Sequence, residues 1–356
     1  MSEAGKRVLI MAGGTGGHIF PGIAVAQALQ ASGWQVAWLG GTGGMEHQLV
    51  PGYGLELHTV AFAGVRGKGV KPLLLLPWRL GSAWLQARRL MAQLQPQLVL
   101  GFGGYISVPG GLAAVSRRIP LVLHEQNAVP GLANRLLAHV ARLTFTAFPK
   151  ALRGAQWVGN PLRAEFAQQA SPRKRFAHRE GPLRLLVIGG SLGAQALNDI
   201  VPRALALIPA PQRPQVTHQS GAKQLEALKA NYAQAGVEAE LTAFIKNTAR
   251  AYAEADLVLC RAGASTVTEI AAVGAAACFV PYPHAVDDHQ TVNANYLVAE
   301  DAAWLVQQNA LTPQALAEFI QRLTRDELRA RAAKAQALAK MDAVEQIVQA
   351  CEELVE

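Results

Sequence analysis

The sequence predicts an α/β protein built from two doubly wound parallel-sheet domains in tandem, facing each other across a cleft. Two observations support this fold class. Short apolar runs without polar alternation recur between helical stretches, which is typical of parallel strands buried on both faces of a sheet. An apolar run followed by a glycine-rich turn and a helix also occurs twice, with Gly14 and Gly190 in equivalent turns almost half the chain apart. The 356 residues suffice for two domains of roughly 100–200 residues each.

Four apolar runs in the first half of the chain are predicted strands. The first, Arg7–Met11, leads into the turn AGGTGGHIFPG and a helical run over Ile23–Leu29. The other three are Gln35–Leu39, Leu98–Gly101 and Pro120–His124. Because helical stretches separate these runs, the strands are expected to form a parallel sheet.

The same pattern restarts after Val158–Arg163, where a glycine and a proline interrupt regular structure. The predicted strands of the second half are Arg184–Ile188, Leu257–Cys260 and Ala277–Val280. We therefore expect an N-terminal domain over residues 1–161 and a C-terminal domain over residues 162–340. The Ala-rich end of the chain, from residue 328, is predicted to be helical, and residues 341–356 are expected to pack back toward the N-terminal domain.

The composition excludes several classes of protein. Hydrophobic residues make up 51% of the chain and charged residues 16%, whereas disordered chains are polar and rich in charge. The three cysteines lie far apart, which argues against a disulfide scaffold or zinc ribbon and is typical of a reducing compartment. The apolar run near the N-terminus is too short for a signal peptide, and Leu73–Trp78 is too short for a membrane span. We expect a soluble, cytoplasmic protein.

The net charge of +8 is concentrated in one segment. No acidic residue lies between Glu56 and Glu125, where eight basic residues occur, and the rest of the chain has equal numbers of both signs. Residues 63–90 mix cations with leucine and tryptophan, which suits an anionic membrane surface but also fits an amphipathic core helix with a solvated basic face. The segment alone does not decide between these two. Nucleic acid is disfavoured as a partner, because no stacking aromatics or known binding motif accompany the charge.

Two glycine-rich turns are candidate phosphate-binding loops. GGTGGH (Gly13–His18) leaves backbone N–H groups able to approach an anion at a helix N-terminus. It lacks the third glycine and downstream acid of a dinucleotide fingerprint, and also the lysine of a P-loop. GGSLG (Gly189–Gly193) repeats the arrangement, with Ser191 able to donate to a phosphate. His18 is a candidate base or hydrogen-bond donor, and alternatively a capping residue.

Three further clusters follow predicted strands. Arg261–Glu269 opens a helix with small and hydroxyl residues that suit a diphosphate and an acid that suits ribose hydroxyls; alternatively, Ser265 or Thr266 caps that helix. HEQN (His124–Asn127), with GGY (Gly103–Tyr105) after the neighbouring strand, is expected to form a polar wall at the carboxyl end of the sheet. The group Asp287-Asp288-His289 alone is weak evidence for a metal, so no metal site is predicted.

In this order and at these intervals, the motifs resemble those of the MurG family of N-acetylglucosaminyltransferases. They are GGTGGH, GGY, HEQN, GNP-x-R, GGS-x-G, R-x-GA-x-T-x-x-E and DHQ, and the resemblance covers about residues 7 to 345. It implies the GT-B fold, UDP-N-acetylglucosamine as donor and lipid I as acceptor. It also implies peripheral attachment to the cytoplasmic face of the bacterial inner membrane.

The resemblance implies roles for individual residues. It assigns donor binding to Thr15, Gly16, Gly17, Asn127, Arg163, Ser191, Ile245, Ala264, Ser265, Thr266, Val267, Thr268, Glu269 and Gln290. Of these, Ile245 is expected beside the uracil and Gln290 at the sugar hydroxyls. His18, Tyr105 and Glu125 are the implied acceptor-side or catalytic residues. The chain departs from the family at Lys246-Asn247, where many members are acidic, which puts contacts near the base in question.

The resemblance also favours the membrane interpretation of the basic segment. Lipid I carries an undecaprenyl diphosphate, so an acceptor-binding domain must meet it at an anionic bilayer. The residues expected to contact the membrane are Arg66, Lys68, Lys71, Leu74, Leu75, Trp78 and Arg79.

The implied reaction is a single in-line displacement that turns an α-linked donor into a β-linked product. A base deprotonates the C4 hydroxyl of the muramoyl sugar, and that oxygen attacks C1 of N-acetylglucosamine. Loop amides, a helix dipole and arginine would neutralise the leaving UDP, so no metal or other cofactor is expected. Both His18 and Glu125 are candidate bases, and Glu125 alternatively orients His18.

Two other functions stay open from the residues themselves. A nicotinamide-dependent two-domain dehydrogenase would share the two Rossmann-like units, although the missing glycine and acid argue against it. A non-catalytic sensor at the membrane would bind UDP-N-acetylglucosamine but release no UDP when an acceptor is supplied.

Overall fold

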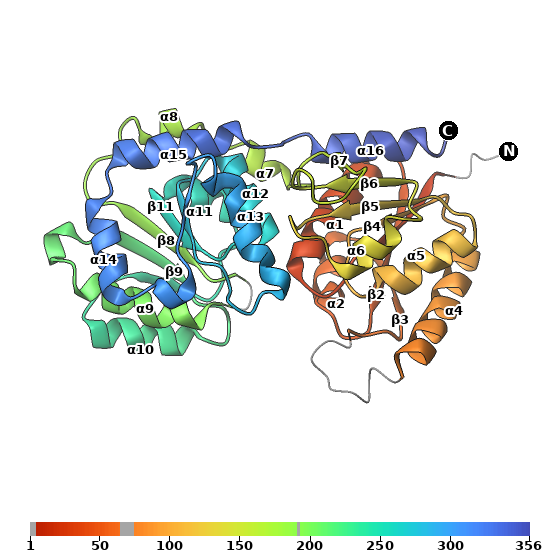
Figure 1. Cartoon of the computed structure of the whole chain (residues 1–356), viewed down its shortest axis with the longest axis horizontal. Helices are drawn as coiled ribbons and strands as arrows, with labels where there is room; N and C mark the ends of the chain where they lie inside the picture. Colours follow the sequence, from red (N-terminus) through yellow and green to blue (C-terminus); the bar gives the residue numbers. More distant parts are fainter. Residues whose placement is uncertain (1–4, 65–74, 191–192) are drawn as a thin grey trace. The chain divides into compact units, whose positions relative to one another are not determined.

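The computed structural model describes residues 5–64, 75–190 and 193–356 (Figure 1). It divides into two compact units, the first comprising residues 1–163 and 340–356 and the second comprising residues 164–339. Each unit contains one parallel sheet with helices packed against it. The predicted class, two parallel-sheet α/β domains, is therefore confirmed.

The sheet of the first unit has seven strands in the order β3-β2-β1-β4-β5-β6-β7. The strands are β1 (Arg7–Met11), β2 (Gln35–Gly41), β3 (Glu56–Val60), β4 (Leu98–Gly101), β5 (Leu121–Glu125), β6 (Leu143–Thr146) and β7 (Gln156–Trp157), all paired in parallel. Two predicted strands match β1 and β4, while β2 runs two residues longer and β5 lies one residue later. The sequence did not reveal β3, β6 and β7, because strands toward a sheet edge are partly exposed and lack a continuous apolar run.

Alternate residues of β1 face two separate cores. Val8 and Ile10 pack in the core that includes residues of α1 (Gly16–Ala31) and α16 (Ala343–Glu353). Leu9 and Met11 pack in the core that includes residues of α4 (Leu76–Leu94), α5 (Ser107–Ser116) and α6 (Leu132–Leu137). The short helices α2 (Glu46–Leu49) and η1 (Val50–Tyr53) connect β2 to β3. Burial on both faces explains why the strand sequences are apolar without alternation.

The last helix belongs to the first unit although it follows the second unit in the chain. Ala343, Ile347 and Cys351 of α16 are buried in the core that also contains Ile19 and Ile23 of α1. The helices α1 and α16 are in direct contact.

The sheet of the second unit has six parallel strands in the order β10-β9-β8-β11-β12-β13. They are β8 (Arg184–Ile188), β9 (Gln215–Gln219), β10 (Glu240–Thr242), β11 (Leu257–Cys260), β12 (Ala277–Phe279) and β13 (Trp304–Leu305). The helices are α7 (Ala164–Ala167), α8 (Pro172–Phe176), α9 (Gln195–Ala206), η2 (Ala210–Gln212), α10 (Leu225–Ala235), α11 (Thr248–Glu254), α12 (Ala264–Val273), η3 (Val286–Asp288), α13 (His289–Val298), η4 (Gln308–Ala310), α14 (Pro313–Arg322) and α15 (Arg325–Ala337). The core on one face joins β8, β9 and β11 to α9, α10 and α14.

Each unit buries one histidine in its neutral form. His124 Nε2 donates to the Gly159 carbonyl (2.9 Å), and His218 Nδ1 and Nε2 lie 3.0 Å from the Tyr232 hydroxyl and Asn198 Oδ1. Burial lowers the pKa of His124 to about 4 and that of His218 to about 3. Neither ring can take up a proton readily without losing the folded state.

We expect acid to destabilise both units. Because the folded-state pKa values lie below the unfolded value of about 6.5, the unfolded chain binds more protons as the pH falls. Each histidine then costs about 2 kcal/mol of unfolding free energy between pH 7 and pH 5, and the loss continues until the pH reaches its folded pKa. Thermal unfolding measured across this range should show a falling Tm. The His218→Gln variant should flatten the slope for the second unit, whereas the exposed control His178→Gln should keep it; an unchanged slope in His218→Gln would contradict the prediction.

Candidate active site

The glycine turn after β1 brings His18 to the carboxyl edge of the first sheet. Gly14 has a φ of 95°, which glycine adopts more readily than other residues. The helix α1 begins at Gly16, and the Thr15 side chain at its N-cap makes no capping hydrogen bond. An uncapped N-terminus of a sixteen-residue helix is suited to an anion. One amide of the turn is already engaged, because Gly14 N donates to Glu46 Oε2 at 3.2 Å.

The His18 ring lies against the GGY turn that follows β4. Its Cδ2 is 3.1 Å from the position that a Cβ on Gly103 would occupy, and Asn134 Nδ2 is 3.3 Å from the same position. His18 Nδ1 is 3.5 Å from Thr15 Oγ1. Because Gly103 has no side chain, His18 and Asn134 can both pack closely against it. The φ of 92° at this position also favours a glycine.

The Glu125 carboxylate, at the end of β5, is saturated by hydrogen bonds. Its Oε1 accepts from Asn127 N (2.8 Å) and Asn127 Nδ2 (3.3 Å), and its Oε2 accepts from Gly131 N (3.1 Å) and Asn134 Nδ2 (2.9 Å). Burial raises the pKa of the Glu125 carboxyl, while these four hydrogen bonds lower it by a smaller amount. The side chain is 2% exposed, and its contacts hold the loop that leads into α6.

The HEQN residues are more buried than the sequence suggests. His124, Glu125 and Gln126 are at most 2% exposed, so three of the four residues expected to form a polar wall are buried. The cluster continues a central strand, where neighbouring backbone and side-chain groups supply partners for buried polar atoms. Gln126 Nε2, for example, donates to His124 Nδ1 at 3.1 Å.

Tyr105 packs over the glycine turn from the other side. One ring carbon lies 3.6 Å from the position of a Cβ on Gly14, and the ring would collide with a Cβ on Gly41. Burial, and to a smaller extent the nearby Glu46 carboxylate, raises the pKa of the Tyr105 phenol. Tyr105 is therefore a neutral phenol in this site.

In the second unit, the start of α12 contains small and hydroxyl-bearing residues. Its N-cap is Gly263, which has no side chain, so the alternative in which Ser265 or Thr266 caps the helix is wrong. Ser265 Oγ is buried and has no hydrogen-bond partner among the described residues. Thr268 Oγ1 instead donates to the Ala264 and Ser265 carbonyls, both at 3.0 Å, and the Val267 side chain is fully buried.

The Glu269 carboxylate is held by a buried tyrosine of α11. Tyr252 is 2% exposed, and its hydroxyl lies 3.4 Å from Glu269 Oε2. Burial and Glu269 keep the pKa of the Tyr252 phenol well above its ordinary value, so the hydroxyl stays protonated and donates. Glu269 is partly exposed at the surface of this site.

Arg261 and Gln290 hold the turn after β12. Arg261 donates to the carbonyls of Val280 (3.0 Å) and Pro281 (3.2 Å) and to Gln308 Oε1 (2.7 Å). Gln290 Oε1 accepts from Ala262 N (3.3 Å) and Tyr282 N (2.9 Å). Since its oxygen is engaged, Gln290 has its Nε2 amide group to offer a ligand.

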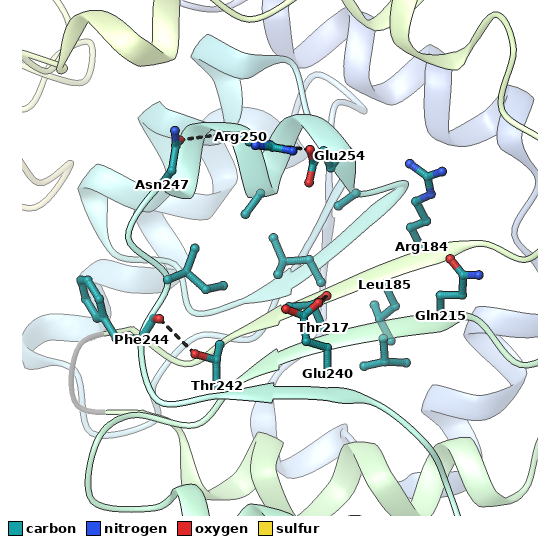
Figure 2. A pocket seen from close by; sticks show the side chains of 15 residues that line it. Arg184, Leu185, Gln215, Thr217, Glu240, Thr242, Phe244, Asn247, Arg250 and Glu254 are labelled. Carbon is teal, nitrogen blue, oxygen red and sulfur yellow. Dashed lines mark hydrogen bonds and ion pairs between the residues drawn. The ribbon is translucent and has the colours of Figure 1, made fainter.

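A pocket of about 620 Å³ lies between α11 and the strands β8, β9 and β10 (Figure 2). Ile245 and Phe244 line it, together with polar residues such as Thr217 and Glu240. Asn247 caps α11, because its side chain accepts from Arg250 N at 2.9 Å. Aspartate and asparagine cap equally well, so the departure from acidic residues at this position preserves the local structure.

The remaining predicted residues fall into three groups. The Arg163 guanidinium lies over the Phe20 ring, 5.7 Å from its centroid. On α4 and just before it, Leu75 is 51% exposed, Trp78 is 81% exposed and Arg79 is exposed, while Ala83, Ala87 and Met91 face the core. The residues that lie outside the described part of the chain are Ser191, Arg66, Lys68, Lys71 and Leu74.

Three residues of the site carry no signal in the sequence. Glu46, Asn134 and Tyr252 lie on helices whose sequences match no motif, but they contact the Gly14 turn, Glu125 and Glu269, respectively. Within the ranges that the structure describes, no group of three His, Cys, Asp or Glu residues could hold a metal ion. No helix in those ranges is long and apolar enough to cross a membrane.

Comparison with known proteins assigns both units. The model of the glycosyltransferase family 28 N-terminal domain matches residues 8–146, and that of the family 28 C-terminal domain matches residues 184–348. A protein of Acidovorax sp. (strain JS42) is 62% identical over 98% of this chain and 88% of its own. A protein of Ralstonia nicotianae is 56% identical over 97% of this chain and 96% of its own. Both are named UDP-N-acetylglucosamine–N-acetylmuramyl-(pentapeptide) pyrophosphoryl-undecaprenol N-acetylglucosamine transferase.

The crystal structure of Acinetobacter baumannii MurG superimposes with a TM-score of 0.85 at 41% identity, covering 98% of this chain and 99% of that one. The chain belongs to the MurG family. Membership in the MurG family makes it a hexosyltransferase with the GT-B fold, and it removes the dehydrogenase alternative, which has no support in these comparisons.

Proposed function

We propose that the chain transfers N-acetylglucosamine from UDP-N-acetylglucosamine to the C4 hydroxyl of the muramoyl sugar of lipid I, which gives lipid II for peptidoglycan synthesis. The observation that carries the proposal is the match, at 62% identity over 98% of the chain, to a transferase named for this reaction. The geometry of the two units supports it in the particulars that follow.

The start of α12 supports donor binding in the second unit. An anion there would accept a hydrogen bond from the unpartnered Ser265 Oγ and would be stabilised by the helix dipole. Glu269, held by Tyr252, is suited to the two hydroxyls of a ribose. The Nε2 group of Gln290 is suited to a sugar hydroxyl, and Ile245, which lines the pocket under α11, to the uracil.

The remaining donor contacts follow the family resemblance. We assign them to Thr15, Gly16, Gly17, Asn127, Arg163, Ser191, Ala264, Thr266, Val267 and Thr268. Val267 and Thr268 would contact the donor through their backbone, because their side chains are buried and Thr268 Oγ1 already donates within α12. Backbone amides, helix dipoles and Arg163 would neutralise the charge that develops on the departing UDP.

We assign the general base to His18. The oxygens of Glu125 already accept four hydrogen bonds, so Glu125 would have to break one of them in order to take a proton. His18 is partly exposed beside the GGY turn. It takes the proton of the C4 hydroxyl, that oxygen attacks C1 of N-acetylglucosamine, and UDP leaves. Glu125 holds Asn134 and the HEQN loop in place around His18.

The exposed surface of the helices α4, α5 and α6 supports the proposal that the chain contacts an anionic membrane, at the cytoplasmic face of the inner membrane. They pack side by side on one face of the first sheet. Large apolar side chains are exposed on this α4–α6 surface, namely Leu75, Trp78, Leu85, Leu112, Val115, Leu132, Leu136 and Val140. Exposed cations accompany them, namely Arg79, Arg88, Arg89, Arg117, Arg118, Arg135 and Arg142. An amphipathic core helix would bury its large apolar residues, whereas α4 leaves Trp78 and Leu85 exposed.

Release of UDP tests the function. The purified chain, UDP-N-acetylglucosamine and a polyprenyl-linked lipid I analogue should release UDP and add one N-acetylhexosamine to the acceptor, as measured by mass spectrometry. Without the acceptor, release should fall to background. If UDP-N-acetylglucosamine binds but the acceptor stimulates no release, the chain is a sugar-nucleotide sensor and the proposed function is wrong.

A further inference from the structure

Gln219 is the last residue of β9 and lies between the ends of the two neighbouring strands. In the parallel register it is level with Ile188, the last residue of β8, and with Thr242, the last residue of β10. The chain leaves β8 into residues 189–193, which we call the phosphate turn, and leaves β10 into residues 243–247, which we call the uracil loop. Gln219 therefore lies where these two segments begin, at the carboxyl edge of the sheet.

The side-chain amide of Gln219 donates a hydrogen bond to each of these segments. Its Nε2 donates to the Gly190 carbonyl in the phosphate turn at 3.0 Å and to the Ala243 carbonyl in the uracil loop at 3.3 Å. A primary amide nitrogen carries two protons, so one proton is available for each carbonyl. Gln219 is 3% exposed, and buried hydrogen bonds are costly to leave unmade. The amide therefore joins the two segments directly.

The backbone of the phosphate turn is built around the same contact. Gly193 N donates to the Gly190 carbonyl at 3.0 Å, so this oxygen receives one bond from within the turn and one from Gln219. Gly193 has a φ of 78°, and a Cβ added to it would collide with the carbonyl oxygen of Ser220. A glycine at this position therefore lets the turn pack against the residue that follows Gln219.

The uracil loop is held from the same side. Ser220 N donates to the Thr242 carbonyl at 2.9 Å, which continues the contact between β9 and β10 past their ends. Thr242 Oγ1 donates to the Phe244 carbonyl at 3.1 Å (Figure 2). Together with the bond from Gln219 to the Ala243 carbonyl, these contacts fix the backbone that leads into the pocket under α11.

We propose that Gln219 is a positioning residue that sets the spacing between the phosphate turn and the uracil loop, and so matches the site to a nucleoside diphosphate. The inference rests on the proposed function, in which these two segments bind the donor. One nucleotide can contact both segments only when their separation matches the length of its ribose and diphosphate. Because Gln219 fixes this separation in advance, the ligand does not have to order the two segments when it binds.

Truncated ligands test the role of Gln219. Gln219→Met keeps the length of the side chain but removes both donated protons. The affinity for UDP, measured by calorimetry, should fall by about tenfold to a hundredfold, because two buried hydrogen bonds that hold the site are lost. The affinity for uridine, measured by competition, should fall by less than about threefold, because uridine does not have to reach the phosphate turn. Equal losses for the two ligands, or an unchanged affinity for UDP, would overturn the proposal.

Steady-state kinetics provide a readout that a general loss of structure would not reproduce. In Gln219→Met, KM for UDP-N-acetylglucosamine should rise by the same factor as the dissociation constant of UDP, while kcat at saturating donor stays close to the wild-type value. A lower kcat with an unchanged KM would overturn the proposal. If Gln219→Met does not fold, Gln219→Asn makes the same test, because its amide is too short to reach both carbonyls.

A matched control is Gln321→Met on α14, where an exposed amide Nε2 donates to Gln212 Oε1 at 3.2 Å. This variant should keep the wild-type affinity for both ligands and the wild-type KM. Failure of the proposed function itself looks different, because the wild type would then release no UDP when the acceptor is supplied.

Discussion

Replacing His18 with alanine is expected to lower kcat by about 10²- to 10⁴-fold, because a positioned general base contributes about this much to a rate. The C4 hydroxyl would have to lose its proton to water instead. The uridine and ribose contacts that we propose lie in the second unit, so the affinity for UDP should change little. Initial rates of UDP release at saturating lipid I analogue, with calorimetric titration of UDP, provide the measurement.

Two comparisons make the assignment to His18 specific. His178→Ala, at an exposed position of the second unit, should keep the wild-type rate. Glu125→Gln should lower the unfolding temperature together with the rate. The substitution replaces one carboxylate oxygen with an NH2 group, which cannot accept hydrogen bonds. Either the bonds from Gly131 and Asn134 or those from Asn127 are then lost. Near-normal turnover in His18→Ala would rule out His18 as the base. A loss of turnover in Glu125→Gln with unchanged stability would move the role to Glu125.

Removing the exposed apolar and basic groups at the start of α4 should weaken binding to anionic vesicles by at least about a hundredfold. Burial of a large apolar side chain in the interface contributes up to about 1.5–3 kcal/mol, and each cation near the surface contributes about 1 kcal/mol. The triple variant Leu75→Ser, Trp78→Ser, Arg79→Gln removes two large apolar side chains and one cation. Co-sedimentation with vesicles that contain phosphatidylglycerol measures the partition coefficient.

A matched control separates the membrane contact from a general effect of the substitutions. Leu207→Ser removes an equally exposed leucine from the second unit and should leave vesicle binding unchanged. Neutralising Arg66, Lys68, Lys71 and Arg79 together should weaken binding to anionic but not to neutral vesicles, and the affinity for UDP-N-acetylglucosamine should persist. Vesicle binding that is unchanged in both variants would leave the basic segment as a solvated face.

The parts of the fold that the sequence predicted correctly depend on neighbours in the chain. The central strands β1, β4, β8 and β11 coincide with their predicted ranges, because burial on both faces requires a continuous apolar run. The turn at Gly14 was recognisable because a left-handed conformation between a strand and a helix selects glycine. The edge strands left no such pattern, because β3 is partly exposed and β7 consists of two exposed residues.

The sequence alone therefore determined the two α/β units, their glycine turns and, through the order of seven motifs, the family. Only the tertiary structure decided what the polar side chains do there. It engages both oxygens of Glu125, places Tyr252 against Glu269, commits the oxygen of Gln290 to the backbone and sets Glu46 against the Gly14 turn. Motifs and hydrophobic periodicity follow from local backbone requirements, whereas these hydrogen bonds depend on how the loops at the carboxyl edge of each sheet fold and pack, which no local pattern specifies.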